Sequence, residues 1–241
     1  ITLSVGRVDP WWPHTHGEPR CYAASLVIAS ADEQQEIVLA PIGFKTVEFD
    51  RTAGRTAFRV NGVEVFCRGA CWTPADVIGF RADDARLRHV LTLARDGGLN
   101  MLRIGGTMVY EDDRFYRLCS ELGIVVWQDF MFANMDYPVN DAAFANAVEH
   151  EARVQLQRLA MHACVGVYCG GSEVQQQAAM VGMPASDWSN TFFDNTLPQL
   201  IGEHHAGVPY FPSSPCEGVL PFQPGEGIVH YYGVGAYRRP L

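Results

Sequence analysis

The hydrophobic positions of this chain follow one pattern in its first quarter and another in the rest. Up to about residue 50, short apolar runs at 22–28 and 36–39 and an alternating segment at 44–49 are separated by polar turns, which is typical of β-strands. Next, Asn61 and Gly62 stand between two alternating segments, the pattern of a β-hairpin with a type I′ turn. The first quarter of the chain is therefore expected to be β-structure.

After this hairpin, strand patterns and helix patterns alternate. Strands are predicted at residues 65–70, 100–104, 124–127, 165–168, 209–211 and 228–231, and helices at 83–95, 112–122, 141–162 and 187–203. Gly97, Gly98 and Gly123 are suited to end the first two helices. Such regular alternation predicts parallel strands joined by right-handed crossovers, and hence an α/β fold.

An open doubly wound sheet and a barrel both satisfy this alternation. The G-x-G-x-x-G fingerprint of the open dinucleotide-binding sheets is absent after the first strand, and no phosphate-binding G-x-x-x-x-G-K-[ST] motif occurs. Polar and aromatic residues instead follow several successive strands, which favours a (β/α)8 TIM barrel with about six of its eight strands in this chain. Because two or three strands cannot form a stable domain alone, the first part is expected to be the C-terminal end of a β-sandwich.

Composition and charge exclude several classes of partner. The 241 residues carry a net charge of -9, which argues against nucleic acid or an anionic membrane as a partner. No apolar run of about 18 residues and no signal peptide occur, so no membrane association and a cytoplasmic location are expected. The chain lacks an initiator Met and looks cut from a longer protein. Its seven scattered cysteines fit reduced thiols, and nothing indicates an oligomeric state.

One carboxylate has the position of a catalytic group. Glu173 follows the apolar strand at 165–168 after the small residues Gly170 and Gly171, which leave room for a ligand. Catalytic groups of α/β barrels lie at the carboxyl ends of the strands, so Glu173 is a candidate acid/base. The alternative is a glutamate that interacts with the dipole of the following helix.

Other strand ends carry residues suited to bind a substrate. Arg103 could orient a carboxylate or bind a hydroxyl group, or form a structural ion pair in the barrel mouth. Trp72 and Trp127 could stack on the apolar face of a sugar ring, although a tryptophan there is as often part of the core. The helical histidines His89 and His150, with His162, are expected to be surface or packing residues. No metal and no cofactor are implied.

A family likeness extends over nearly the whole chain in collinear order. It is carried by residues 11–13, 17, 22, 42–44, 60–62, 68–76, 100–103, 110–113, 115–116, 168–173, 210–215 and 230–231, and by Leu-Gly-Ile-Val-Val-Trp-Gln-Asp-Phe-Met-Phe at 122–132. In these stretches the chain resembles glycoside hydrolase family 2, in particular its β-mannosidase branch. The resemblance implies the end of an immunoglobulin-like β-sandwich at residues 1–52 and the N-terminal part of a catalytic TIM barrel at 53–241.

The resemblance also implies a reaction and a set of site residues. Such enzymes are retaining glycosidases with two glutamates, acting on terminal β-glycosidic bonds of a β-linked oligosaccharide or glycoside. Glu173 maps onto the acid/base. The nucleophile belongs to a Ser-Glu-Phe-Gly type motif that does not occur before Leu241, so it is expected beyond this chain, and the 241 residues alone are expected to be inactive. The implied substrate-binding residues are Arg103, Asp129, Trp72, Trp127, Ser172, His230 and Tyr231, with Asp129 matching the ligand of a mannose hydroxyl.

Four positions depart from the family pattern. Ser172 replaces the Asn that precedes the acid/base, Cys71 replaces the Asn before Trp72, Tyr232 replaces a Trp, and the segment at 104–107 lacks a Trp. These changes keep open a second reading, a non-catalytic carbohydrate-binding relative of the same fold. An isomerase or aldolase barrel is a third, but the only lysine, Lys45, lies in the sandwich part and cannot serve as a Schiff-base residue of the barrel.

Overall fold

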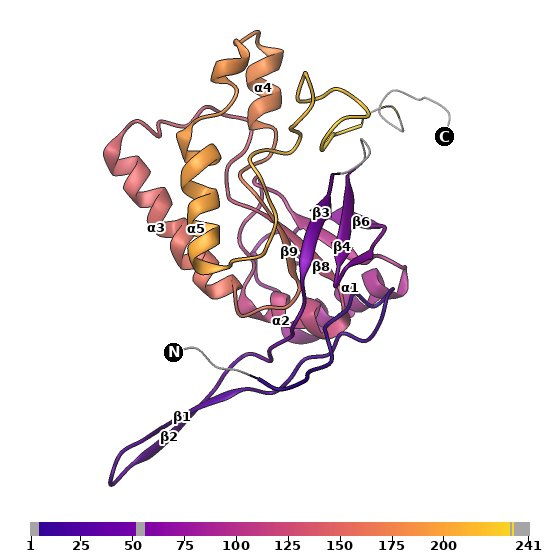
Figure 1. Ribbon diagram of the computed structural model, residues 1–241, viewed down its shortest axis with the longest axis vertical. Coiled ribbons are helices and arrows are strands. Elements are labelled where there is room, and N and C mark those ends of the chain that lie inside the picture. The colour runs from indigo at the N-terminus through magenta and orange to yellow at the C-terminus, as the bar shows by residue number, and fades with distance from the viewer. Residues whose placement is uncertain (1–4, 52–55, 232, 234–241) are drawn as a thin grey trace.

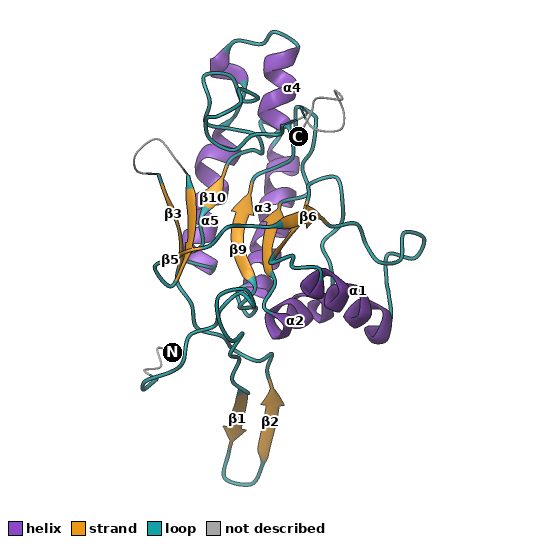
Figure 2. Ribbon diagram, turned by 90° about the vertical axis from the view of Figure 1, so that its right-hand side faces the viewer, coloured by secondary structure: helices purple, strands orange, loops and turns teal. Residues whose placement is uncertain are grey.

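A five-stranded parallel sheet forms the centre of the computed structural model, which describes residues 5–51, 56–231 and 233. Its strands are β6 (Gly69–Cys71), β7 (Met101–Ile104), β8 (Val125–Asp129), β9 (Val165–Cys169) and β10 (Tyr210–Phe211). They are ordered β6-β7-β8-β9-β10 with parallel neighbours, so each crossover reaches the adjacent strand without reversal. The carboxyl ends therefore share one edge, which faces α4 (Val174–Met180) in Figure 2.

Helices α1 (Asp84–Asp96) and α2 (Asp113–Leu122) pack on each other, and α2 also packs on β8. Helix α3 (Ala142–Leu159) packs on α5 (Leu197–His204), on the other side of the molecule in Figure 1. Asp83, Asp112 and Asp141 cap the first three helices, and Gly123 ends α2 with a φ of 70°. The first three predicted helices are thus confirmed. Within the described residues, no helix has the length and apolarity needed to cross a membrane.

The helix predicted over residues 187–203, with an interruption at Pro198, is found in part: helical structure begins at about residue 191 and its first part is π-helical. A short 3-10 turn covers Ala185–Asp187, a π-helical turn covers Phe192–Thr196, and only then does α5 begin. The helical run does not end at Pro198, which directly follows the π-helical turn and stands in the first turn of α5. Helix α4 was not predicted.

A small antiparallel sheet lies against the parallel one, where Phe49 of its first strand contacts Phe211. It consists of β3 (Val47–Asp50), β4 (Ala57–Val60) and β5 (Val63–Glu64), and Asn61 and Gly62 turn between the last two with φ values of 51° and 77°. Both values are positive, as a type I′ turn requires, so the predicted hairpin is confirmed. The ring of Phe49 packs edge-on against Phe211 of β10, 4.9 Å between centroids. The predicted domain boundary at 52/53 falls outside the described residues and stays a prediction.

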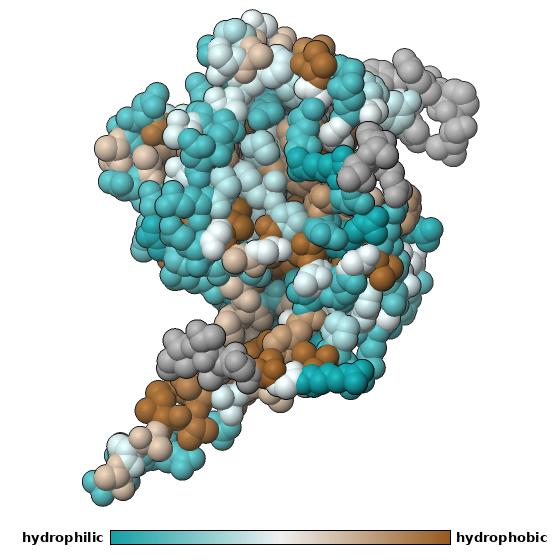
Figure 3. All heavy atoms as spheres, in the orientation of Figure 1, coloured by the Kyte–Doolittle hydropathy of each residue, from teal (hydrophilic) through white to brown (hydrophobic). Residues whose placement is uncertain are grey.

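A second hairpin, β1 (Ser25–Ala29) and β2 (Gln34–Val38), projects from the body (Figure 1). The predicted strands are present with small shifts in their bounds. All ten residues are exposed, and hydrophobic side chains gather on its face in Figure 3. The structure thus shows two antiparallel sheets in the first quarter of the chain, and their membership of a sandwich stays a prediction.

The predicted sixth strand at residues 228–231 is wrong. Ile228 forms an isolated antiparallel bridge with Cys216, and Val229, His230 and Tyr231 are not part of a strand. The chain here folds back on its own Cys216 and does not extend along β10, because a turn-rich loop with Gly225 and Gly227 at positive φ lies between the two residues. The described part of the chain therefore contributes five parallel strands.

Candidate active site

Glu173 stands where the chain leaves β9 and enters α4. Its backbone is left-handed, with φ 59° and ψ 16°, a conformation that costs a non-glycine residue roughly 1–3 kcal/mol and is concentrated at functional sites. Its N–H donates to the carbonyl of Ser214 at 2.8 Å, which ties the strained residue to the loop after β10. The preceding Gly170 is required by sterics, because a Cβ there would lie 2.2 Å from the carbonyl oxygen of Pro212.

The carboxylate of Glu173 is held by a histidine 57 residues further along the chain. Nδ1 of His230 lies 2.9 Å from Oε1 of Glu173. On the other side of the ring, Nε2 lies 3.3 Å from Nη1 of Arg103 and 3.0 Å from Oγ of Ser214. Because a guanidinium can only donate, we infer that Nε2 accepts and that Nδ1 carries the hydrogen given to Glu173.

Arg103, at the end of β7, is fixed in turn by Asp129 at the end of β8. The two form a bidentate pair, with Nη2–Oδ2 at 2.7 Å and Nε–Oδ1 at 3.3 Å. Asp129 is fully buried and also accepts from Trp127 Nε1 at 2.9 Å and Gly106 N at 3.0 Å. Burial alone would lower the pKa of Arg103, but the pairing with Asp129 outweighs it and raises that pKa.

These contacts bring four of the predicted site residues into one continuous network, Asp129–Arg103–His230–Glu173. Sequence reasoning missed Ser214, which bonds both His230 and the backbone of Glu173. A signal existed, since the Ser-Ser-Pro segment after β10 is among the family-like stretches. The network draws on the carboxyl ends of three neighbouring strands and the chain after β10.

The two tryptophans are placed among core side chains. Trp72 is buried, its ring tilted on Phe115 at 4.9 Å, and Trp127 stacks on Phe211 at 5.4 Å with an interplanar angle of 4°. These positions favour the packing alternative for both rings, and contact with a sugar stays a prediction. Ser172 is half-buried and bridges Ala133 and Ser214 through its backbone.

A buried carboxyl group accompanies Trp72. Glu111 accepts a hydrogen bond from Nε1 of Trp72 at 2.8 Å and is only 9% exposed. Burial raises the pKa of Glu111, and the Trp72 hydrogen bond opposes this without cancelling it. Sequence reasoning had not singled out Glu111.

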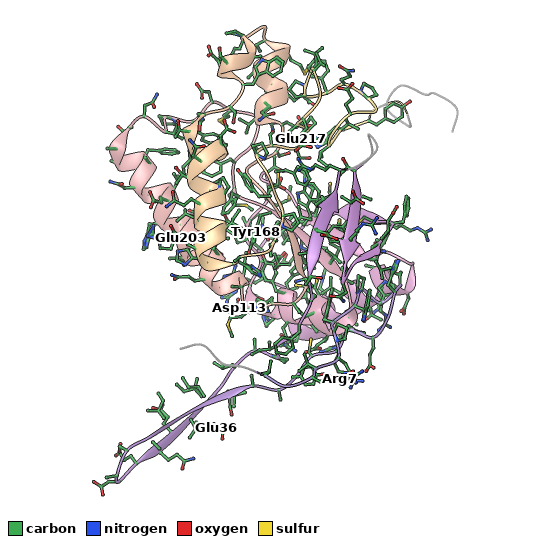
Figure 4. The ribbon with its side chains drawn as sticks, in the orientation of Figure 1. Arg7, Glu36, Asp113, Tyr168, Glu203 and Glu217 are labelled. Carbon is green, nitrogen blue, oxygen red and sulfur yellow. The ribbon has the colours of Figure 1, made fainter. Side chains whose placement is uncertain are left out.

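A pocket of about 750 Å³ opens beside Glu173 and His230. Helix α4 supplies one wall, and the opposite wall comes from the loop with Phe222, Pro224 and the exposed Tyr231. At the same end of the molecule, Glu217 is paired with Arg51 at 2.6 Å, and Figure 4 shows Glu217 near α4. The described carboxylates Asp129 and Glu217 are thus each bound by an arginine, while Glu173 faces the pocket.

Comparison with known proteins gives the family. No family model matches the chain. The curated protein Beta-mannosidase B of Aspergillus flavus is 34% identical over 97% of the chain, and that of Aspergillus fumigatus is 32% identical over the same share. The crystal structure of the β-D-mannosidase of Dictyoglomus thermophilum matches 93% of the chain with a TM-score of 0.85 and 33% identity. The predicted resemblance to the β-mannosidase-like branch of glycoside hydrolase family 2 is confirmed.

Two limits of this family relationship matter for function. The chain spans about 30% of the length of the curated β-mannosidases and 28% of the Dictyoglomus thermophilum chain, so the activity of a whole protein is a matter of inference. The exo-chitosanase of Amycolatopsis orientalis shares the fold at a TM-score of 0.66 with 18% identity. At that identity the likeness concerns the fold alone.

Proposed function

We propose that this chain is part of a retaining, β-mannosidase-like glycoside hydrolase that cleaves terminal β-glycosidic bonds, with Glu173 as its acid/base. The observation that carries the proposal is the carboxylate of Glu173, held by His230 on a strained backbone at the carboxyl end of β9 and open to a pocket. The similarity to proteins named β-mannosidase supports it.

This mechanism requires two carboxyl groups about 5 Å apart, one as acid/base and one as nucleophile. Glu173 gives its proton to the leaving glycosidic oxygen while the second carboxylate attacks the anomeric carbon and forms a glycosyl-enzyme. Glu173 then takes a proton from water, which releases the sugar and restores both groups. The second glutamate is expected beyond Leu241, in keeping with the ion pairs that already engage Asp129 and Glu217.

The remaining site residues would position these groups and the sugar. His230 would orient the Glu173 carboxyl, and the Arg103–Asp129 pair would offer charged hydrogen bonds to sugar hydroxyls. Tyr231 and Ser172 would line the sugar-binding region, with Ser172 at the family's ligand position for the 2-hydroxyl. The strands β6 to β10 lie side by side in chain order, which supports a TIM barrel over residues 53–241. The remaining strands of that barrel would lie outside the described residues. Residues 1–52 would be the end of the preceding β-sandwich.

One observation favours the second candidate, a carbohydrate-binding relative without turnover. A Cβ added to Gly105 would meet no atom closer than 3.9 Å, one of those atoms being Oδ2 of Asp129. The segment at 104–107, where the family usually carries a Trp, thus leaves open space beside a proposed sugar ligand. A site with this space and with Ser172 could hold sugar without the contacts that strengthen in the transition state.

Hydrolysis by the full-length protein tests the proposal. We expect cleavage of a β-linked mannose disaccharide, and Glu173→Gln should lower kcat by about 10² to 10⁴-fold, the usual contribution of general acid catalysis. A disaccharide is preferable to an aryl glycoside, since an activated leaving group masks the loss of the acid. Glu203→Gln, on α5 away from this site in Figure 4, is the matched control. Unchanged rates in Glu173→Gln would contradict the assignment, and binding without turnover would support the second candidate.

A further inference from the structure

A second pocket lies at the other edge of the parallel sheet, away from Glu173. It has a volume of about 520 Å³ and is formed where three connections meet, residues 42–47 before β3, 160–163 between α3 and β9, and 205–208 between α5 and β10. The amino ends of β9 and β10 therefore adjoin it, whereas Glu173 follows the carboxyl end of β9. Small-molecule sites usually have about 300–1,000 Å³, so this pocket has the size of a site that is separate from the one described above.

Lys45, the only lysine of the chain, lines this pocket. The side chain is half-buried, and its Nζ lies 5.8 Å from the centroid of the Trp11 ring. Within the described part of the chain, no hydrogen bond or ion pair reaches Nζ, and the residues that line the pocket include no Asp or Glu. His162 and His205 also line it, but burial lowers the pKa of both imidazoles, so they are neutral at pH 7. The amine of Lys45 thus lies in a pocket that offers it no counterion.

These surroundings favour the neutral, nucleophilic form of the amine. Burial lowers the pKa of Lys45 from 10.5 to about 8, and the thiols of Cys164 and Cys21 oppose this only in part. Burial acts on the thiols in the other direction, because it raises the pKa of Cys164 to about 12 and also raises the pKa of Cys21. At pH 7 the neutral fraction of Lys45 exceeds that of an ordinary lysine by roughly 300-fold, while both thiols stay protonated. The amine is therefore the nucleophile of this group of side chains.

We propose that Lys45 is an acylation site, at which the amine reacts with a small acyl phosphate that enters this pocket. The nitrogen lone pair attacks the carbonyl carbon, and the N–C bond forms as the C–O bond to phosphate breaks. Phosphate leaves with that electron pair, and the nitrogen loses its extra proton to water. The product is a neutral amide in place of an unpaired ammonium, which suits the apolar part of the lining, Ile42, Val47, Met161 and Val208. The proposal is independent of the function proposed for Glu173.

The test is the reaction of the full-length protein with acetyl phosphate, followed by mass spectrometry of the peptide that contains Lys45. A synthetic peptide of residues 40–50 in the same tube is the control, because it carries the same lysine with an ordinary pKa. At pH 7 we expect Lys45 to react at least about tenfold faster in the folded protein, since the lower nucleophilicity of a weaker base offsets only part of its larger neutral fraction. The rate should level off above about pH 8 in the folded protein and keep rising in the peptide.

Ala206→Trp tests whether the reagent enters through the pocket. Ala206 is exposed and lines the pocket, so a tryptophan there should narrow the entrance and slow acetylation of Lys45 severalfold. Ala185→Trp, at an exposed position outside the lining, is the matched control and should leave the rate unchanged. Equal rates in these two variants would overturn entry through the pocket.

The comparison with the peptide needs no variant, so it decides the proposal even where Ala206→Trp does not fold. A rate at pH 7 in the folded protein that is equal to or below that of the peptide would overturn the acylation site. A rate that keeps rising to pH 10 in the folded protein would do the same. Because each readout is a mass and not a turnover, these results stand apart from any loss or presence of glycosidase activity.

Discussion

Nδ1 of His230 donates to Oε1 of Glu173 at 2.9 Å, while the same ring faces Arg103 through Nε2. The contact joins a loop without regular structure to the residue that directly precedes α4. Both side chains are about one-fifth exposed, so the pair lies at the pocket surface and not in the core. The histidine thereby couples the position of the Glu173 carboxyl to the Arg103–Asp129 pair.

Replacing His230 should therefore damage catalysis more than binding. In the full-length protein we expect His230→Leu to lower kcat on a β-linked disaccharide by up to about 100-fold, since a misplacement of roughly 1 Å can cost this much. His230→Asn, whose amide can donate from the place of Nδ1, should retain more activity. The measurement is steady-state kinetics with kcat and KM determined separately. Equal activity of both variants with the unaltered protein would show that the ring does not position Glu173.

The Arg103–Asp129 pair should couple strongly in stability. Asp129→Asn leaves the largely buried guanidinium of Arg103 without its counterion, and breaking a buried pair costs about 3–5 kcal/mol. In a double-mutant cycle with Arg103→Met, the double variant should be less destabilised than the sum of the single ones, by at least about 1 kcal/mol. Denaturant unfolding of the full-length protein gives the four values. Additive effects would contradict a direct, desolvated pair.

Local sequence signals predicted most of the framework. Asn61 and Gly62 can both adopt positive φ, and Gly123 ends α2 in the left-handed conformation, so those elements follow from residue chemistry alone. The helix predicted over 187–203 was found only in part because its apolar periodicity does not show where α-helical hydrogen bonding begins. The strand at 228–231 failed because a strand exists only through its partner, and Ile228 pairs with Cys216.

Only part of the candidate site was predicted from the sequence. Strand-end position was enough to select Arg103 and Glu173, because parallel strands bring their carboxyl ends to one edge, whereas Asp129 was selected through the family resemblance. Ser214 was not predicted as a site residue. The Ser-Ser-Pro segment marked its neighbourhood, but its contacts with His230 and with the backbone of Glu173 depend on how two loops meet in space, which periodicity does not encode.

Glu111 offers a test through the pH dependence of stability. Burial raises its pKa in the folded chain above the ordinary 4.5, and the Trp72 hydrogen bond only partly offsets this. A carboxyl group whose pKa is higher in the folded state destabilises the fold where it is ionised and has no such effect below its unfolded pKa. The penalty is therefore full at neutral pH and fades as the pH falls through the raised pKa toward 4.5.

Glu111→Gln removes the charge but keeps an amide oxygen that can accept from Nε1 of Trp72. We expect this variant to unfold at a higher temperature than the unaltered protein at pH 7, with a difference that shrinks toward pH 4.5. Thermal unfolding of the full-length protein between pH 4 and 7 measures it. Glu36→Gln, on the exposed strand β2, should show no such difference at any pH. A lower unfolding temperature for Glu111→Gln at pH 7 would mean that the charged carboxylate strengthens its bond to Trp72 by more than its burial costs.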